Sequence, residues 1–377
     1  MIYFVVLVTL LLFAIKYDLK PISNKTNKYF CFLFIIFVLI AGLRYRVGTD
    51  TMNYHDEYLN SSLSYIKDRY LIGWYLLMYS FSSFNCSFYI VQLVIAFVIN
   101  YGVFVFLKQE QNKMLFSTLT IYYVLIYPAW NFEVLRQGIC ISIFFLSFSF
   151  LKRHQYIKYY IFTILACTIH ETALLLLVLP VFSHFKITRA NLSIFAVFSF
   201  VLIFIAPFLR DYILNITMAL QFADEKAMYY LDDIDVDVSS ASIASYSFNI
   251  VLNVIFPYWV LYKNIVRKRR SDLFNICAVI AITSYILSIF IPILYRINYY
   301  FVMFTYILYI DGIQYMVVLF KKKFNYCMYL LILFCFLSFK SRMYFLKDEM
   351  NSPVYVHYYP YSSLFDEHKV PERDKLK

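Results

Sequence analysis

Charged residues are scarce in this chain of 377 residues, because Asp, Glu, Lys and Arg together make up only 15% of it. A soluble protein of this size would build one or two cores from short amphipathic elements, which need many more polar positions. Cysteine motifs are also lacking. The seven cysteines form no CxxC pair and show no Cys/His spacing typical of a metal site, so we interpret them as small packing residues.

Long apolar runs make up much of the sequence. Hydrophobic residues make up 62% of the chain. Runs of about 15 to 22 residues recur from end to end, the length that crosses the hydrocarbon core as a helix. Because lipid offers backbone amides no partner, each run must be helical. The sequence predicts an all-α, polytopic transmembrane helical bundle of about 11–13 helices. The expected spans cover residues 2–15, 29–43, 88–107, 114–128, 134–151, 157–169, 172–183, 191–209, 243–262, 273–291, 297–319 and 324–339.

The charges that are present predict which loops lie in the cytoplasm. Basic residues outnumber acidic ones by 34 to 23, and they gather in short loops, which indicates the cytoplasmic side rather than a nucleic-acid surface. These loops cover residues 16–28, 151–158, 183–191, 262–270 and 321–323. The acidic segment 224–240 is expected outside. It lacks the glycine and distal glutamate of a calcium loop, so we interpret it as a solvated loop rather than a ligand site.

This topology places the N-terminus outside and treats residues 1–377 as a single integral membrane domain. The first apolar run has no basic region before it and no cleavage site after it, so we expect a retained helix rather than a signal peptide. The number of crossings then requires residues 70–83 to form a re-entrant or interfacial helix. Residues 44–69 and 210–242 become external loops, and residues 340–377 form a C-terminal tail.

Four polar groups stand at span ends, where lipid disfavours them. Charged side chains at membrane depth are costly, so they usually face a cavity or a partner and mark a functional site. In the predicted topology all four groups lie on the outer face. They occur within residues 44–69, 131–138, 167–172 and 294–298. The sequence therefore predicts one shared external cavity.

Arginine dominates these polar groups. Arg44, Arg46, Arg136 and Arg296 are permanent cations whose planar guanidinium suits phosphate oxygens, so the cavity fits a lipid-linked diphosphate. Plainer interpretations stay open. Arg44 and Arg46 also fit side chains that extend from a helix end toward the interface, and Arg136 also fits a pair with Glu133 one turn earlier.

Groups that can accept or donate a proton accompany the arginines. They are Asp50, His55, Asp56, Glu57 and His170. Two of them also have a structural interpretation. His170, between apolar runs, fits a capped helix break. Asp50, after Gly48, fits a turn residue, and Asp50 or Thr51 fits the cap of a short helix that follows.

Five segments stand in a fixed order along the chain. They are "GLRYRVGTDTMNYHDEY" (42–58), "FEVLRQGICISIFFLSFSFL" (132–151), "LACTIHETALLLLVLPVF" (165–182), "LYRINYYF" (294–301) and "VHYYPYSSLF" (356–365). Together they resemble the EpsG family of polysaccharide polymerases, the Wzy-like proteins of bacterial surface-glycan assembly. One departure occurs at residues 69–75, which read "RYLIGWY" where many relatives carry Glu-Pro-Gly-Tyr.

The resemblance implies glycosyl transfer at the outer face of the bacterial inner membrane, by a GT-C-like helical bundle. The growing glycan on undecaprenyl diphosphate would pass to a sugar hydroxyl of the next lipid-linked repeat unit, and the arginines would stabilise the departing diphosphate. Asp50 or His170 would be the general base. The implied contacts to the diphosphate and sugars fall on Arg44, Arg46, Asn53, Tyr54, Arg136, Gln137 and Arg296.

The same resemblance sets the expected ligands. The lipid diphosphate is already an activated donor and the arginines neutralise it, so no metal, nucleotide or other cofactor is expected. The chain accordingly has no Walker A or Rossmann sequence. The expected partners are the undecaprenyl-diphosphate-linked oligosaccharide, the membrane lipid, and a chain-length regulator and a flippase of the same pathway, but no nucleic acid.

Two other functions fit parts of the pattern. A flippase or exporter of the same lipid-linked sugar would also need outward-facing basic groups. It would, however, line a path from both faces, often in two related halves, and the sequence has no such repeat. An acyltransferase that modifies surface glycans would place a catalytic histidine toward a cytoplasmic acyl donor, whereas His170 is expected outside.

Overall fold

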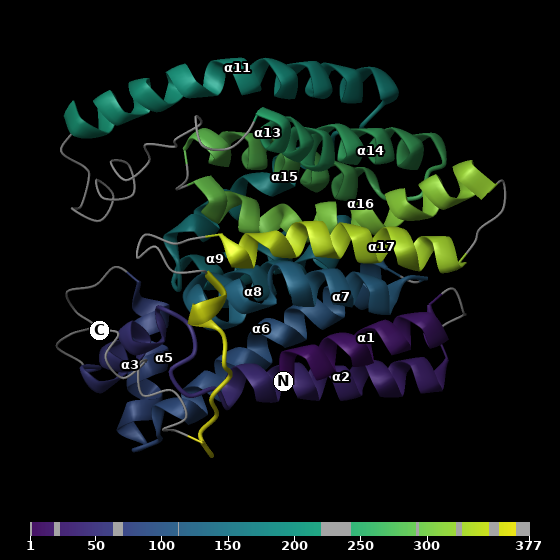
Figure 1. The fold of residues 1–377 in the computed structure, drawn as a ribbon. Coiled ribbons are helices and arrows are strands. Elements are labelled where there is room, and N and C mark those ends of the chain that lie inside the picture. Colours follow the sequence, from purple (N-terminus) through teal and green to yellow (C-terminus); the bar gives the residue numbers. More distant parts are fainter. Residues whose placement is uncertain are drawn as a thin grey trace. The chain divides into compact units, whose positions relative to one another are not determined.

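The computed structural model describes residues 2–18, 23–62, 71–111, 113–219, 243–291, 294–321, 326–346 and 354–366. Within these residues the chain is helical (Figure 1), and the single β-type pairing is an isolated bridge between Arg44 and Ser363. The predicted all-α class is confirmed.

Six of the described helices are long and apolar enough to cross a membrane. Five of them are α2 (Asn24–Gly42), α6 (Phe88–Glu110), α8 (Leu135–Lys152), α15 (Asp272–Phe290) and α16 (Tyr295–Lys321). The sixth covers Cys327–Phe345, which combines α17 (Tyr326–Ser341) with the 3₁₀ helix η5 (Arg342–Phe345). Large apolar side chains also stay exposed, such as Phe4 at 69% and Ile194 at 65%, and these positions suit a lipid surround. The chain is a multi-pass membrane protein, as predicted.

The chain divides into two compact units. The first comprises residues 1–179 and 327–377. In it α1 (Ile2–Tyr17) packs against α7 (Leu115–Leu125), α2 against α6, α6 against α8, and α8 against α9 (Tyr156–Cys167). Helices α6 and α8 approach closely at Gly102, where an added Cβ would lie 2.6 Å from the Cα of Ser142. Small residues at such contacts let membrane helices pack by their backbones.

The second unit comprises residues 180–326. Helix α15 packs against α16 and against α11 (Arg189–Ala219), and α14 (Phe256–Val266) packs against α16. Helix α13 (Ile243–Ile250) and the π-helical η3 (Val251–Ile255) lead directly into α14. The expectation that all of 1–377 forms one integral membrane domain stays a prediction.

Helix α11 is longer than the sequence predicts. It continues to Ala219, so the beginning of the segment expected to be an external loop, 210–242, is helical. The acidic stretch 224–240 lies outside the described residues.

Four shorter elements lie between the longer helices of the described chain. The π-helical η1 (Ala129–Glu133) separates α7 from α8. The 3₁₀ helix η2 (Glu171–Val178) and the short α10 (Leu179–Phe182) follow a break after α9. Helix α5 (Ile72–Ser83) has 12 residues, a length of about 18 Å, which falls short of the ~30 Å hydrocarbon core. That length suits the interfacial or re-entrant helix predicted for residues 70–83.

A buried carboxylate organises the basic loop between α14 and α15. Asp311 of α16 is fully buried. Its two oxygens accept hydrogen bonds from Arg270 at 2.8 and 2.9 Å, and Arg269 lies 2.8 Å away. Asn264 donates to the same carboxylate at 3.2 Å. A buried carboxylate needs compensating partners, and Arg269 and Arg270 supply them. These two arginines belong to the loop predicted to be cytoplasmic, and their contacts with Asp311 fix that loop to α16.

Candidate functional site

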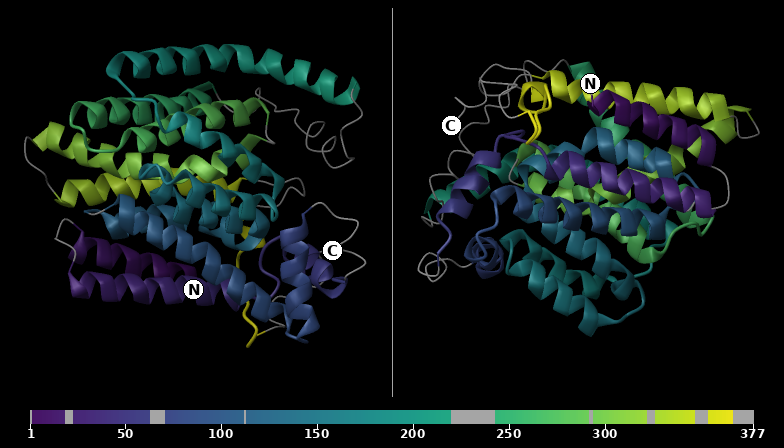
Figure 2. Two further views of the ribbon diagram at one scale, coloured as in Figure 1. Left: turned by 180° about the vertical axis from the view of Figure 1, so that it is seen from behind. Right: turned by 90° about the horizontal axis from the view of Figure 1, so that it is seen from below.

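The candidate site lies in the first unit, where the short helices α3 (Thr51–Leu59) and α5 gather beside the end of α2 and the beginning of α6 (Figures 1 and 2). Gly48 turns the chain out of α2 with a φ of 98°, and an added Cβ would lie 2.9 Å from the carbonyl oxygen of Phe132. Only glycine accepts this backbone conformation at such a close contact.

A carboxylate from η1 holds the turn between α2 and α3. Glu133 accepts hydrogen bonds from the backbone N–H groups of Thr49 and Asp50, each at 3.2 Å, and from the Thr49 hydroxyl. An anion at the first turn of a helix satisfies N–H groups that have no partner within the helix and interacts favourably with the helix dipole. Glu133 therefore caps α3 from a distant part of the chain.

Asp50 stands at the N-cap position of α3 but makes no side-chain capping bond. Its Oδ1 instead accepts a hydrogen bond from Asn53 at 3.2 Å, and the Thr51 hydroxyl donates to the carbonyl of Val47 at 2.7 Å. The interpretation that the side chain of Asp50 or Thr51 caps α3 is therefore wrong, because neither side chain bonds a first-turn N–H group of the helix. Asp50 is half-buried and Asn53 is exposed.

Arg136, in the first turn of α8, faces α3 and α5. Its Nη2 lies 3.3 Å from Oε1 of Glu57, and its guanidinium lies 5.8 Å from the ring centroid of Tyr54 and 5.7 Å from that of Trp74. The second oxygen of Glu57 accepts a hydrogen bond from Trp74 Nε1 at 2.9 Å. The interpretation that Arg136 pairs with Glu133 is therefore wrong.

This cluster of Tyr54, Glu57, Trp74 and Arg136 is held by an ion pair and a hydrogen bond but stays partly exposed. The Arg136 side chain is 28% exposed and that of Glu57 is 20% exposed, so a ligand can reach the guanidinium. Tyr54 is buried, and its hydroxyl donates to the carbonyl of Glu133 at 2.9 Å. Burial raises the pKa of the Tyr54 hydroxyl, so it stays protonated and acts as a fixed donor.

Arg44 has a different environment from Arg136. It is fully buried, and its guanidinium donates to the carbonyls of Ala41 at 2.5 Å and Val47 at 3.1 Å and lies 5.2 Å from the Phe132 ring centroid. Burial lowers its pKa to about 10, so it remains a cation at neutral pH. Arg44 thus caps the C-terminal end of α2, where a positive charge is favourable.

The C-terminal segment 354–366 lies along the turn after α2. Tyr45 N–H donates to Ser362 at 3.0 Å, Gly48 N–H donates to His357 at 3.1 Å, and Leu364 N–H donates to Leu43 at 3.0 Å, in each case to the carbonyl oxygen. The segment "VHYYPYSSLF" is therefore part of the site's frame. The sequence marked it as a motif but gave no role for it within the expected tail 340–377.

Arg46 and His55 line a small depression on the face of α3 that meets the beginning of α6. Its other walls are Thr51, Met52, Phe88 and Tyr89, and its volume is about 20 Å³, which is room for roughly one water molecule. Arg46 is half-buried with a φ of 49°. The His55 ring lies edge-on to Phe88, with 5.3 Å between centroids.

His170 lies at the break between α9 and η2 and is buried. Its Nδ1 accepts a hydrogen bond from the backbone N–H of Thr172 at 3.2 Å and lies 2.9 Å from the Thr172 hydroxyl. His170 therefore caps η2, as one of its two interpretations predicts. Helix α5 joins this break to α3, because Gly73 N–H donates to the carbonyl of Thr168 at 2.8 Å and α5 also packs against α3.

The two remaining predicted residues differ in position. Gln137 is buried beside Arg136 in α8. Arg296 is half-buried in the first turn of α16, which belongs to the second unit. Its membership of the same cavity stays a prediction. Within the described ranges, no three His, Cys, Asp or Glu side chains come together as a metal site would require.

Comparison with protein families identifies the class of this chain. A model of the EpsG family matches residues 27–363. The chain belongs to the EpsG family. This family is associated with Wzy-like polysaccharide polymerases. No curated protein and no solved structure matches the chain, so the expected GT-C-like architecture stays a prediction.

The EpsG match covers the site described above except for residues 364–366 of the C-terminal segment. Three of the five segments that carried the resemblance, 42–58, 132–151 and 356–365, meet in the first unit through the Glu133, Arg136 and Gly48 contacts. The segment 165–182 joins them through α5, while 294–301 begins α16 of the second unit. The family motifs thus correspond largely to one folded site.

Sequence reasoning missed two residues that shape this site. Glu133 was considered only as a partner for Arg136, since residues three apart meet on a regular helix. The chain is π-helical up to Glu133 and non-helical at Val134, so that spacing does not apply. Trp74 had no assigned role, although it is one of only 3 tryptophans and an indole N–H within an apolar segment needs an acceptor.

Proposed function

We propose that this EpsG-family protein polymerises undecaprenyl-diphosphate-linked oligosaccharide repeat units by glycosyl transfer at the outer face of the bacterial inner membrane. The observation that carries the proposal is Arg136. It is a partly exposed guanidinium oriented by Glu57 and by two aromatic rings. A planar cation with several fixed donors can bind two diphosphate oxygens at once, and an oriented one needs no rearrangement as charge develops.

The reaction forms one bond and breaks one. The acceptor sugar hydroxyl attacks the anomeric carbon of the growing glycan, and the bond from that carbon to the diphosphate oxygen breaks. The electron pair leaves with undecaprenyl diphosphate, and the hydroxyl proton passes to a general base. The developing negative charge lies on the diphosphate, so Arg136 stabilises the transition state more than the ground state.

Asp50 suits the role of base better than His170. The backbone N–H of Thr172 donates to Nδ1 of His170, so Nδ1 already accepts a hydrogen bond. The neutral imidazole then carries its proton on Nε2, and neither ring nitrogen is left to accept the proton of the sugar hydroxyl. Asp50 is half-buried and its carboxylate is oriented by Asn53. In this proposal His170 shapes the helix break, and Asp50 accepts the proton.

The other residues have supporting roles. Arg46 in the turn after α2 and Asn53 in α3 contact the sugar or the diphosphate. Arg44, Tyr54 and Gln137 are buried, so they act by holding the elements that carry Arg136 and Asp50. The chain-length regulator and the flippase of the pathway remain expected partners.

The test is polymerisation of purified lipid-linked repeat unit by the full chain in nanodiscs, normalised to folded protein. Arg136→Ala should lower kcat/KM by about 10²-fold or more. Arg136→Lys should also be impaired, because it keeps the charge but loses the planar fork. The control is Arg153→Ala, an exposed arginine just beyond the other end of α8, which should retain the wild-type rate. A normal rate for Arg136→Ala would remove this residue from the mechanism.

Two further measurements separate the roles. Asp50→Asn should bind repeat unit but turn over about 10²- to 10⁴-fold more slowly, as expected for loss of a base, whereas His170→Gln should lower thermal stability more than specific activity. In cells, deletion should collapse a glycan ladder to single repeat units. Complete loss of surface glycan with repeat units trapped inside would instead indicate a flippase.

A further inference from the structure

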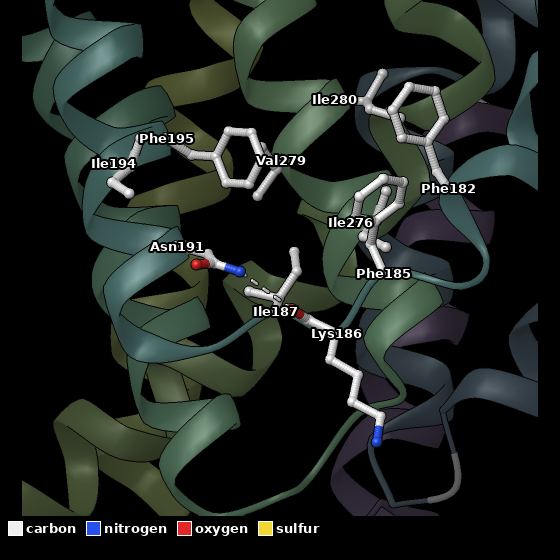
Figure 3. A pocket seen from close by; sticks show the side chains of 10 residues that line it. All are labelled: Phe182, Phe185, Lys186, Ile187, Asn191, Ile194, Phe195, Ile276, Val279 and Ile280. Atoms are coloured by element: carbon white, nitrogen blue, oxygen red, sulfur yellow. Dashed lines mark hydrogen bonds between the residues drawn. The ribbon is translucent and has the colours of Figure 1, made fainter.

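An apolar crevice lies beside α11 in the second unit. It has a volume of about 360 Å³, within the range of roughly 300–1,000 Å³ usual for small-molecule sites. Ile194 and Phe195 of α11 form one wall, and Ile276, Val279 and Ile280 of α15 form the other (Figure 3). The crevice has an almost entirely apolar interior, which suits a hydrocarbon chain.

One end of the crevice carries a cation. Lys186 belongs to the lining, and Figure 3 shows its side chain leaving the apolar cluster at one end. The turn that carries it is fixed, because Asn191 donates to the Lys186 carbonyl at 3.3 Å and Thr188 accepts from Asn191 N–H at 3.2 Å. Lys186 is exposed. Among the residues that the structure describes, no carboxylate pairs with it.

The surrounding sequence strengthens this polarity. Residues 180–191 contain His184, Lys186 and Arg189 but no Asp or Glu. The loop 183–191 is also one of those predicted to be cytoplasmic. A cation at the predicted inner interface, next to an apolar crevice, matches the two ends of an anionic phospholipid of the inner leaflet.

We infer that this crevice binds an anionic phospholipid, with one acyl chain between α11 and α15 and the headgroup phosphate on Lys186. The ligand is a component of the surrounding bilayer rather than a substrate. Its effect is to hold α11, much of whose surface is exposed apolar side chains such as Val197 and Phe204, in place against α15.

A second crevice offers a comparison. It has a volume of about 350 Å³ and lies on the opposite face of α11, against η3 and α14. Its neighbouring cation, Arg189, is placed over the ring of Tyr262 at 5.9 Å. That guanidinium already has a partner, so the observations favour the crevice at Lys186.

The inference is tested by native mass spectrometry of the full chain in detergent. The protein is titrated with phosphatidylglycerol and with phosphatidylethanolamine of identical acyl chains. Wild type should retain phosphatidylglycerol preferentially. Lys186→Gln should weaken that binding by about fivefold, the effect of one interfacial cation. It should weaken phosphatidylethanolamine binding less, because the ammonium of that lipid offsets its phosphate charge. Ile280→Trp fills the crevice without changing charge and should weaken the binding of both lipids.

Lys158→Gln is the matched control, because Lys158 is exposed in the first turn of α9, within the segment 151–158 predicted to be cytoplasmic, and lines no described crevice. It should bind phosphatidylglycerol as wild type does. If Ile280→Trp does not fold, Lys186→Glu supplies the second test and should abolish the preference for the anionic lipid. Equal binding of the two lipids by wild type would overturn the inference, as would equal losses in Lys186→Gln and Lys158→Gln. Displacement of phosphatidylglycerol by undecaprenyl phosphate at lower concentration would instead make this a site for the carrier lipid.

Discussion

Replacing Glu133 by glutamine tests the assembly of the site most directly. The carboxylate accepts three hydrogen bonds from Thr49 and Asp50. The glutamine side chain keeps one acceptor oxygen but places its NH₂ group where the second carboxylate oxygen accepted a hydrogen bond. It also removes the negative charge at the beginning of α3. Three bonds to a charged group would be worth roughly 5–9 kcal/mol in full. Thr49 is exposed, so water replaces much of that loss.

The expected cost is therefore that of a lost helix cap, about 1–2 kcal/mol. Most of this cost falls on α3 and the turn before it, because Glu133 makes its hydrogen bonds there. The lost charge also removes a favourable interaction with buried Arg44 at the end of α2. The lost cap corresponds to a rise of about 5- to 30-fold in the population of locally opened α3. Polymerisation should fall as well, since α3 carries Asn53 and Glu57 and the turn before it carries Asp50.

The assay is hydrogen–deuterium exchange of the full chain in nanodiscs, read on peptides covering residues 51–59 and, for comparison, α6. Glu133→Gln should speed exchange in α3 and leave α6 unchanged. Glu171→Gln, which removes an exposed carboxylate from the first turn of η2, serves as the control and should change neither. Unaltered exchange in α3 would refute the capping role, and faster exchange everywhere would show that Glu133 supports the whole fold.

Buried charges and the topology give three other predictions. Asp311→Asn should lower the free energy of unfolding by about 3–5 kcal/mol, because it leaves Arg270 without its buried counter-charge, and the yield of folded protein in detergent measures this loss. Burial raises the pKa of Asp18 to about 7, above its ordinary value near 4 in an unfolded chain. The stability contributed by protonated Asp18 should therefore be complete below about pH 4 and fall by up to ~1.4 kcal/mol per pH unit until about pH 7. Thermal melts of Asp18→Asn should lack that slope, and equal slopes would contradict the assignment. An impermeant thiol reagent should label Lys268→Cys only from the cytoplasmic side and Asp50→Cys only from the outer side. Labelling of Asp50→Cys only in inverted vesicles would overturn the orientation.

Local sequence patterns were sufficient where a property needs no distant partner. The run expected at 134–151 is α8 (Leu135–Lys152), and that expected at 273–291 is α15 (Asp272–Phe290). A continuous apolar stretch of the right length crosses lipid as a helix whatever surrounds it, so the class and most long helices were predictable. The ordered motifs likewise pointed to the EpsG family, and the polar segments at span ends include most of the site.

The roles of individual side chains depended on contacts that no local pattern contains. Two arginines in similar polar segments have opposite environments, since Arg44 is fully buried under backbone carbonyls whereas Arg136 is partly exposed beside Glu57. The partner of Arg136 is 79 positions away, and Glu133 holds Thr49 across 84 positions. Whether an ionisable group binds substrate or holds the frame depends on its burial and on the partners that packing brings to it. Helix spacing alone therefore offered the wrong glutamate as a partner for Arg136, and only the tertiary structure separated the partly exposed arginine from the buried one.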